Sequence, residues 1–163
     1  MLLTKNQISD ILCFWFPNNN WNNFWFDKSV DQEIYDKYYN LMIDVNNKID
    51  SVNIDNMLYE ELISIIIILD QFSRNINRLK PVNVEEMTNK AKKITLHICN
   101  YGMFHLKTMN HICFILMPLR HTNSIEDYMF ILDILNKIKK EHHGYIFDKF
   151  NRETIRKIQL LSE

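Results

Sequence analysis

Six polar residues have the side chains and the spacing for chemistry, and five of them lie within one short run. Asp70, Arg74 and Arg78 follow one another at intervals of four, and Gln71 and Asn75 form the neighbouring row. Side chains four residues apart share one face of an α-helix, so these groups are predicted to form a dense polar face. The planar guanidinium of arginine can bind a carboxylate or a phosphate through two parallel hydrogen bonds. The run therefore predicts either a structural ion pair or a site for an anionic small molecule or peptide.

The sixth residue, His121, adds acid–base chemistry to this set. In an enzyme, His121 would act as the general base, Asp70 would orient it and Arg74 would stabilise negative charge. Such a set would suit hydrolysis of a small ester or phosphoester. In a purely structural alternative, Asp70 and Arg74 form only an ion pair. Asn75 then ties down a loop carbonyl, and His121 stops a helix. No serine, cysteine or metal-binding set stands out as a nucleophile, so we expect a binding module first and a small hydrolase second.

Aromatic residues are concentrated near the N-terminus, with seven in thirteen positions. They are Phe14, Trp15, Phe16, Trp21, Phe24, Trp25 and Phe26. Such side chains bury large apolar areas, so we expect them to pack as core that anchors the first helix. In the alternative, Trp15 or Trp25 forms the apolar wall of a groove beside the polar run.

One long helix is predicted to carry the polar run. No glycine or proline interrupts residues 57–80, so a single helix can extend over 57–79. Ile66 lies four residues before Asp70. A core-facing Ile66 therefore directs Asp70 and Arg74 towards the edge of the core.

Helix start and stop signals recur along the chain and predict an all-α fold. Side-chain caps are expected at Thr4, Ser29, Asn83 and Ser124. The predicted helices cover about 4–16, 29–48, 57–79, 83–100, 108–117, 124–143 and 153–161. Pro118 is expected to end the fifth of these, which brings His121 to the polar run. The pattern predicts a single helical domain over 1–163, with about seven helices stacked as antiparallel hairpins.

Composition and charge limit the classes of partner. The 163-residue chain is 47% hydrophobic and has two Gly, three Pro and a net charge of −1. This composition does not indicate any particular oligomeric state. The longest apolar run, 62–69, is far too short to span a membrane, so no membrane partner is expected. Residues 137–157 hold seven Lys or Arg against three acidic residues. This stretch leaves nucleic-acid binding as a weaker alternative, since a recognition motif and a basic overall charge are both missing.

Cofactor and thiol chemistry are limited in the same way. No G-x-G-x-x-G, G-x-x-x-x-G-K or H-E-x-x-H motif occurs, so no cofactor and no metal are expected. Cys13, Cys99 and Cys113 are odd in number and form no C-x-x-C pair. Each lies in an apolar context, so we expect buried, reduced thiols and a reducing, cytoplasmic location.

Four motifs together resemble a known family. They are I-L-C-F-W-F at 11–16, W-F at 25–26, L-D-Q-F-S-R-N at 69–75 followed by Arg78, and P-L-R-H at 118–121. In this order and spacing they resemble domain-of-unknown-function family 924, and the D-Q-F-x-R-N run is the most specific part. The resemblance implies an all-α fold of stacked helical hairpins similar to tetratricopeptide proteins. It brings no established activity.

The chain departs from the family pattern at three places. Ser73 stands where the pattern has Pro. Residues 120–123 read R-H-T-N where the pattern has E-H-S-E, so both carboxylates of that motif are missing. Residues 147–152 lack the Gly, Pro and second His of the family's F-G-R-F-P-H-R-N motif. A family site built from those groups would be lost or altered in this member.

Overall fold

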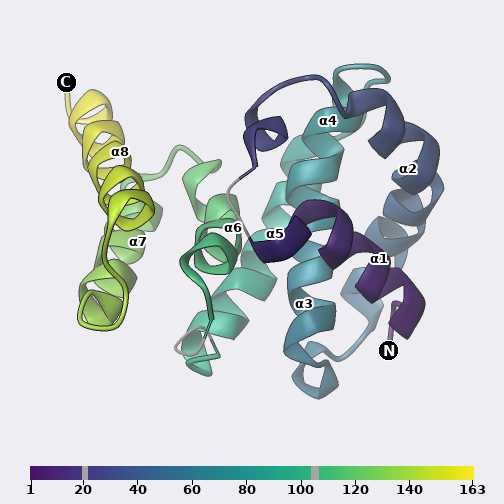
Figure 1. Cartoon of the computed structure of the whole chain (residues 1–163), viewed down its shortest axis with the longest axis horizontal. Helices are drawn as coiled ribbons and strands as arrows, with labels where there is room; N and C mark the ends of the chain where they lie inside the picture. Colours follow the sequence, from purple (N-terminus) through teal and green to yellow (C-terminus); the bar gives the residue numbers. More distant parts are fainter. Residues whose placement is uncertain (20–21, 104–106) are drawn as a thin grey trace.

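The computed structural model describes residues 1–19, 22–103 and 107–163, and every regular element among them is helical (Figure 1). The helices are α1 (Lys5–Trp15), α2 (Asp31–Lys48), α3 (Tyr59–Ile66), α4 (Ser73–Asn77), α5 (Val84–Asn100), α6 (Met109–Arg120), α7 (Ile125–Ile138) and α8 (Tyr145–Leu161). A π-helical turn, Ile67–Phe72, joins α3 to α4 without a break. With α3, the π turn and α4 taken as one rod, the described helices number seven, and the predicted all-α fold is confirmed.

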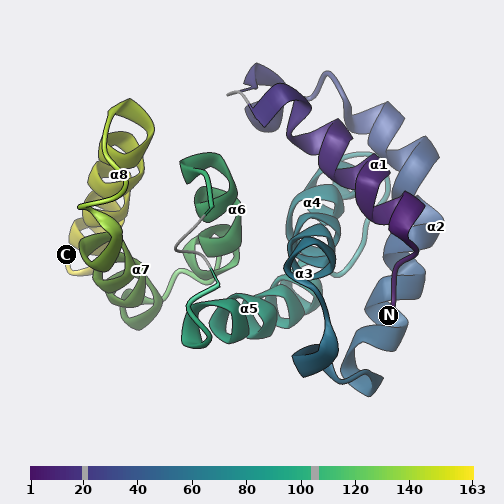
Figure 2. The same ribbon diagram turned by 60° about the horizontal axis from the view of Figure 1, so that its bottom comes forward.

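The helices follow one another through space much as they do along the chain. The rod of α3, the π turn and α4 has α1 and α2 against one side and α5 against the other (Figures 1 and 2). Next in order, α6 packs on α5, and the hairpin of α7 and α8 packs on α6. The N-terminus and the C-terminus therefore lie at opposite ends of the molecule (Figure 1).

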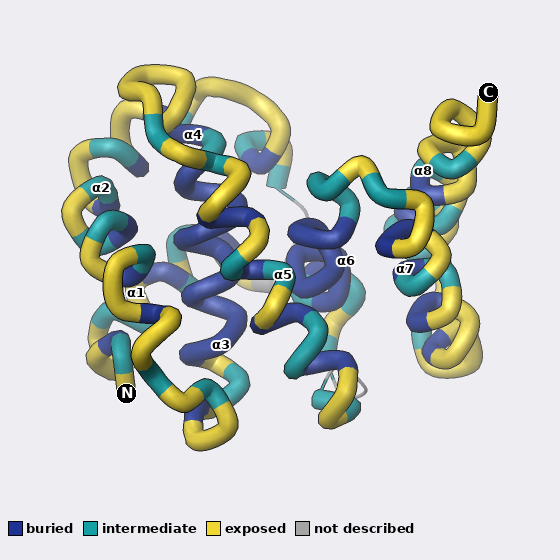
Figure 3. Tube along the Cα trace, turned by 180° about the vertical axis from the view of Figure 1, so that it is seen from behind, coloured by how far each residue is buried: buried dark blue, intermediate teal, exposed yellow. Residues whose placement is uncertain are grey.

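The rod of α3 and the π turn is the centre of the core. Residues 61–73 are all buried, on every face of the helix, and Figure 3 shows this as a continuous dark segment. A helix that is buried on every face must be covered on every face, and α1, α2, α5 and α6 supply that cover. The polar groups of Asp70 and Gln71 are thereby carried into the interior.

The π turn does not interrupt the central helix. The Ser73 N–H donates to the carbonyl of Ile68, five residues earlier, where an α-helix would use the fourth. The predicted continuous helix is confirmed, although it covers Tyr59–Asn77, two residues fewer at each end than predicted. Of the predicted row, Arg74 lies 3.5 Å from Asp70, whereas Arg78 pairs with Asp31 on α2.

Three of the four predicted N-terminal caps are present. The side chains of Thr4, Asn83 and Ser124 each accept a backbone N–H from the first turn of their helix. The prediction at Ser29 is wrong, because its N–H and hydroxyl both donate to Asp27 and α2 starts two residues later. A nearby carboxylate has outcompeted the helix N-terminus for this serine.

Three predicted helix boundaries are also wrong. The helix predicted over 124–143 ends at Ile138. Pro118 does not end α6, which runs on to Arg120. A proline in the last turn removes only one backbone hydrogen bond, and the His121 N–H still donates to Met117. The last helix begins at Tyr145, not near residue 153, because Phe150 packs into the core and extends its buried face.

The aromatic prediction is right for the two tryptophans described and wrong for Phe26. Trp15 and Trp25 are buried and pack together, and the Trp25 indole donates to the Trp15 carbonyl at 2.7 Å. Phe14 is half-buried, whereas Phe26 is 63% exposed. Trp21 lies outside the described residues.

The cysteine prediction is right about pairing and partly wrong about burial. All three thiols are free. Cys99 and Cys113 are buried, but Cys13 is exposed. The buried face of α1 is marked by Ile11 and Trp15, and Cys13 lies between them on the opposite side of the helix.

Candidate functional site

Asp70 is the centre of a buried polar cluster. Its side chain is 0% exposed. One carboxylate oxygen, Oδ2, accepts from the Gln71 amide at 2.7 Å, and the other, Oδ1, accepts from the Thr88 hydroxyl at 3.1 Å. His121 Nδ1 lies 2.9 and 3.0 Å from the two oxygens, and Arg74 Nη2 lies 3.5 Å from Oδ1. The predicted approach of His121 to Asp70 is confirmed.

Four elements converge to make this cluster. The π turn carries Asp70 and Gln71, α4 carries Arg74, α5 carries Thr88, and His121 caps the C-terminal end of α6. A carboxylate removed from water is very costly unless donors surround it. The donors around Asp70 supply this compensation, and their hydrogen bonds join the four elements.

A second buried carboxylate, Asp31, takes two of the residues predicted for the site. The Asn75 amide donates to its Oδ1 at 2.8 Å, and Arg78 Nε donates to its Oδ2 at 2.6 Å. Arg78 Nη2 also donates to Oδ1 and to the carbonyl of Asp27. These hydrogen bonds with Asp31 raise the pKa of the Arg78 guanidinium above its ordinary value. Asn75 and Arg78 are thus separated from His121.

A polar pocket of about 430 Å³ opens beside the Asp70 cluster. It lies between the first turns of α5 and the C-terminal end of α6. Its lining residues are Arg74, Val84, Glu85, Thr88, Asn89, His121, Thr122 and Asn123. The pocket therefore exposes the donors of Asp70, while Asp70 itself stays behind them.

The proposed aromatic wall is not part of this pocket. Trp15 and Trp25 are packed in the core and neither lines the polar pocket. Trp25 instead faces a separate cleft beside α6. The polar pocket is bounded by polar side chains and one aliphatic residue, Val84.

Arg74 and His121 are the groups in the pocket with capacity for binding. The Arg74 side chain is 33% exposed, and its Nη2 donates to Thr88 at 3.0 Å. Its Nε is buried and has no hydrogen-bond partner among the described residues. The His121 side chain is 26% exposed, and Nδ1 faces Asp70. The other ring nitrogen, Nε2, remains for a ligand.

Sequence reasoning missed Thr88 and Asp31. Thr88 carries no local signal, since it is one threonine in an amphipathic helix. Asp31 lies in the acidic stretch of the N-terminal half, which resembles a solvated surface. Only a long-range pairing with Arg78, 47 residues away, distinguishes it from its exposed neighbours.

The sequence matches one known family over residues 11–160, described as bacterial protein of unknown function (DUF924). The chain belongs to this family. The DUF924 match spans both the polar run and His121. No curated protein and no solved structure matches the chain.

Two further observations describe this DUF924 member. Within the described ranges, no helix is long and apolar enough to cross a membrane. In the same residues, no three His, Cys, Asp or Glu side chains gather in a way that could hold a metal ion.

Proposed function

We propose that this DUF924 member is a binding module whose polar pocket holds an anionic small molecule or the acidic end of a peptide. The observation that supports it best is the guanidinium of Arg74. It lines the pocket, it is held in place by Thr88 and Asp70, and a third of its side chain is exposed (33%). A fixed guanidinium suits a carboxylate or phosphate, because little side-chain entropy is lost on binding.

The charges around the pocket support the same class of ligand. Asp70 neutralises part of the positive charge but is shielded behind its donors. Glu85 is negative, but it is exposed at the rim and solvent screens it. Asn123 stands where the family pattern has Glu, so one carboxylate that would repel an anion is missing at the mouth.

The scaffold also suits binding. We propose that the helices form a tetratricopeptide-like stack and that residues 1–163 act as one helical domain in a reducing, cytoplasmic compartment; the packing of α6 on α5 and of α7 and α8 on α6 supports the stack. The three free thiols support that location. The site is assembled from α4, α5 and α6 and so depends on the stack being intact.

Thermal shift and titration calorimetry with inorganic phosphate, acetate and succinate test the proposal. A ligand present at a hundred times its dissociation constant should stabilise the fold by about 2.7 kcal/mol. Arg74→Ala should abolish the shift while the protein stays folded. Arg156→Ala, an exposed arginine on α8, is the matched control and should leave the shift unchanged. Equal binding by parent and Arg74→Ala, or no binding of any probe, would contradict the proposal.

A second candidate, a small hydrolase, has one specific observation in its favour. Asp70 holds His121 through Nδ1, which leaves Nε2 at the pocket as a general base, with Arg74 beside it for negative charge. Turnover of p-nitrophenyl phosphate or acetate that disappears in His121→Asn, while anion binding persists, would favour this candidate. Binding without turnover favours the binding module.

A further inference from the structure

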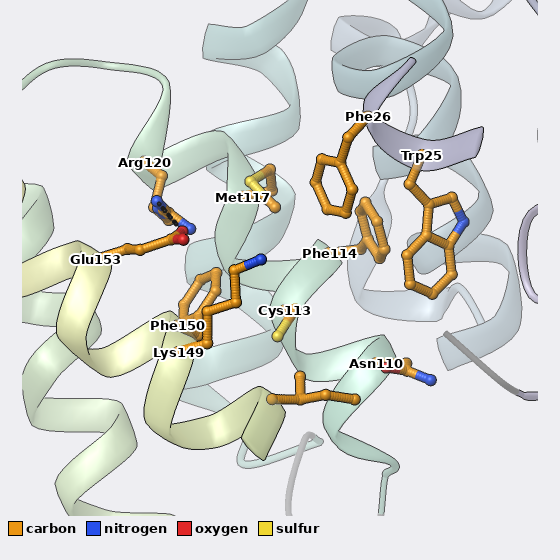
Figure 4. Close-up of a pocket in the computed structure, with 11 residues that line it drawn as sticks. Trp25, Phe26, Asn110, Cys113, Phe114, Met117, Arg120, Lys149, Phe150 and Glu153 are labelled. Atoms are coloured by element: carbon orange, nitrogen blue, oxygen red, sulfur yellow. Dashed lines mark hydrogen bonds and ion pairs between the residues drawn. The ribbon is translucent and has the colours of Figure 1, made fainter. Parts of the chain in front are cut away.

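A second hollow lies between the turn at Asn23–Phe26, α6 and α8 (Figure 4). We name it the apolar cleft, and its volume is about 140 Å³. Its walls are mostly aromatic or sulfur-bearing side chains: Trp25, Phe26, Cys113, Phe114, Met117 and Phe150. It shares no lining residue with the polar pocket.

The size of the cleft indicates the size of its ligand. An apolar cavity of about 150 Å³ in a protein core can bind one benzene molecule. The apolar cleft, at about 140 Å³, therefore accommodates one six-membered ring. Trp25 and Phe114 already meet edge to face, with ring centroids 4.7 Å apart, and present an aromatic wall for such a ring.

Charged groups lie at one side of the cleft. Arg120 lies over the ring of Phe150 at 4.7 Å and pairs with Glu153 at 3.4 Å. Lys149 extends from α8 across the cleft and directs its ammonium towards Phe114 (Figure 4). The two cations exceed the one carboxylate, so the balance favours an anionic group on the ligand.

We propose that the apolar cleft binds a small aromatic carboxylate. The ring lies between Trp25 and Phe150, and the carboxylate meets Lys149 at the edge, with Arg120 adding positive charge. The exposed Phe26, which also lines the cleft, supplies a side chain that covers the ligand. Cys113 serves as apolar wall and not as a nucleophile, because burial raises the pKa of its thiol to about 12.

The test compares phenylacetate with its neutral counterpart 2-phenylethanol, by titration calorimetry on the full chain. Phenylacetate should bind about tenfold more tightly, which corresponds to about 1.4 kcal/mol. Lys149→Gln should bring the two affinities together. Lys140→Gln, an exposed lysine outside the cleft, is the matched control and should keep the difference. Equal affinities in the parent protein, or an unchanged ratio in Lys149→Gln, would overturn the proposal.

Two more variants locate the binding site. Cys113→Leu adds bulk to the cleft wall and should weaken phenylacetate binding; if it does not fold, Ile146→Trp at the edge serves the same purpose. Arg74→Ala removes the cation of the polar pocket and should leave phenylacetate binding intact. Binding that is lost in Arg74→Ala but kept in the cleft variants would place phenylacetate in the polar pocket and refute the inference. The proposals for the apolar cleft and for the polar pocket can therefore be refuted independently of each other.

Discussion

Asp31, on α2, and Asp70, on the central rod, are both buried carboxylates, yet only Asp70 adjoins one of the two pockets described above. Asp31 is held by the fork of Arg78 and the amide of Asn75, and none of these three residues lines a pocket described above. Asp70 is held by four side chains, and three of them, Arg74, Thr88 and His121, also line the polar pocket. A buried charge alone therefore does not indicate a site. A buried charge indicates a site when the side chains that donate to it also line a pocket.

The largest effect is expected from removing the carboxylate of Asp70. In Asp70→Ala, the buried donors of Gln71 and Thr88 lose their acceptor, and the guanidinium of Arg74 loses its counter-charge. The free energy of unfolding should fall by about 3–5 kcal/mol, as when one member of a buried ion pair is removed. Urea denaturation measures this, and a loss below about 1 kcal/mol would show that the cluster does not stabilise the fold.

Asp31→Ala should cost less, about 2 kcal/mol. The Asn75 amide is buried and loses its partner, but Arg78 is 35% exposed and can be rehydrated. The same denaturation experiment applies, with Asp36→Ala as a control on the same helix. Asp36 is exposed and should change stability by less than about 0.5 kcal/mol. A cost for Asp31→Ala above that for Asp70→Ala would reverse the comparison.

Double-mutant cycles sharpen the contrast between the two arginines. The Asp31–Arg78 pair is two-pronged and its carboxylate is buried, so its coupling energy should be about 1.5 kcal/mol. The Asp70–Arg74 contact at 3.5 Å is longer and one-sided, and its coupling should stay below about 1 kcal/mol. Similar coupling energies for both pairs would mean that Arg74 stabilises the fold as much as Arg78 does, which would weaken its role as a ligand donor.

The smallest expected effect is a change in the tautomer of the His121 ring, without a change in stability. Because Nδ1 of His121 faces a carboxylate, its neutral ring should carry the proton on Nδ1 and leave Nε2 bare. Nitrogen-15 NMR of the histidine rings distinguishes the two tautomers. Asp70→Asn should shift His121 towards the other tautomer, whereas Asp31→Asn should not. A proton on Nε2 in the parent protein would exclude His121 as the base of a hydrolase.

Local signals predicted most of the fold. The caps at Thr4, Asn83 and Ser124 act over three residues, and the sequence states them directly. The inward position of Asp70 followed from one apolar run that turns polar without a break. Errors arose where a signal had a competitor, as when Asp27 took the Ser29 side chain, or where a rule was applied too strictly, as at Pro118.

The candidate site was half predictable. Asp70, Gln71, Arg74 and His121 come together as expected. The division of the polar run between two carboxylates was not predictable, because it depends on the distant Asp31, which accepts from Asn75 and Arg78. A pairing across 47 residues leaves no mark on the composition or hydrophobic pattern of the run itself.

The π turn makes the effect of a deletion depend on where in the rod it falls. The turn Ile67–Phe72 holds one residue more than an α-helix would use, so removing Ile67 would let the rod close into an uninterrupted α-helix. The wide turn would absorb the missing residue, and α4 would keep its orientation relative to α3. The same deletion within the regular α-helix of α3 would rotate everything after it by about 100°, since each α-helical residue turns the chain by that amount. Asp70 would then leave Thr88 and His121, and Arg78 would leave Asp31, so a one-codon deletion in α3 would dismantle both clusters while one in the π turn would spare them.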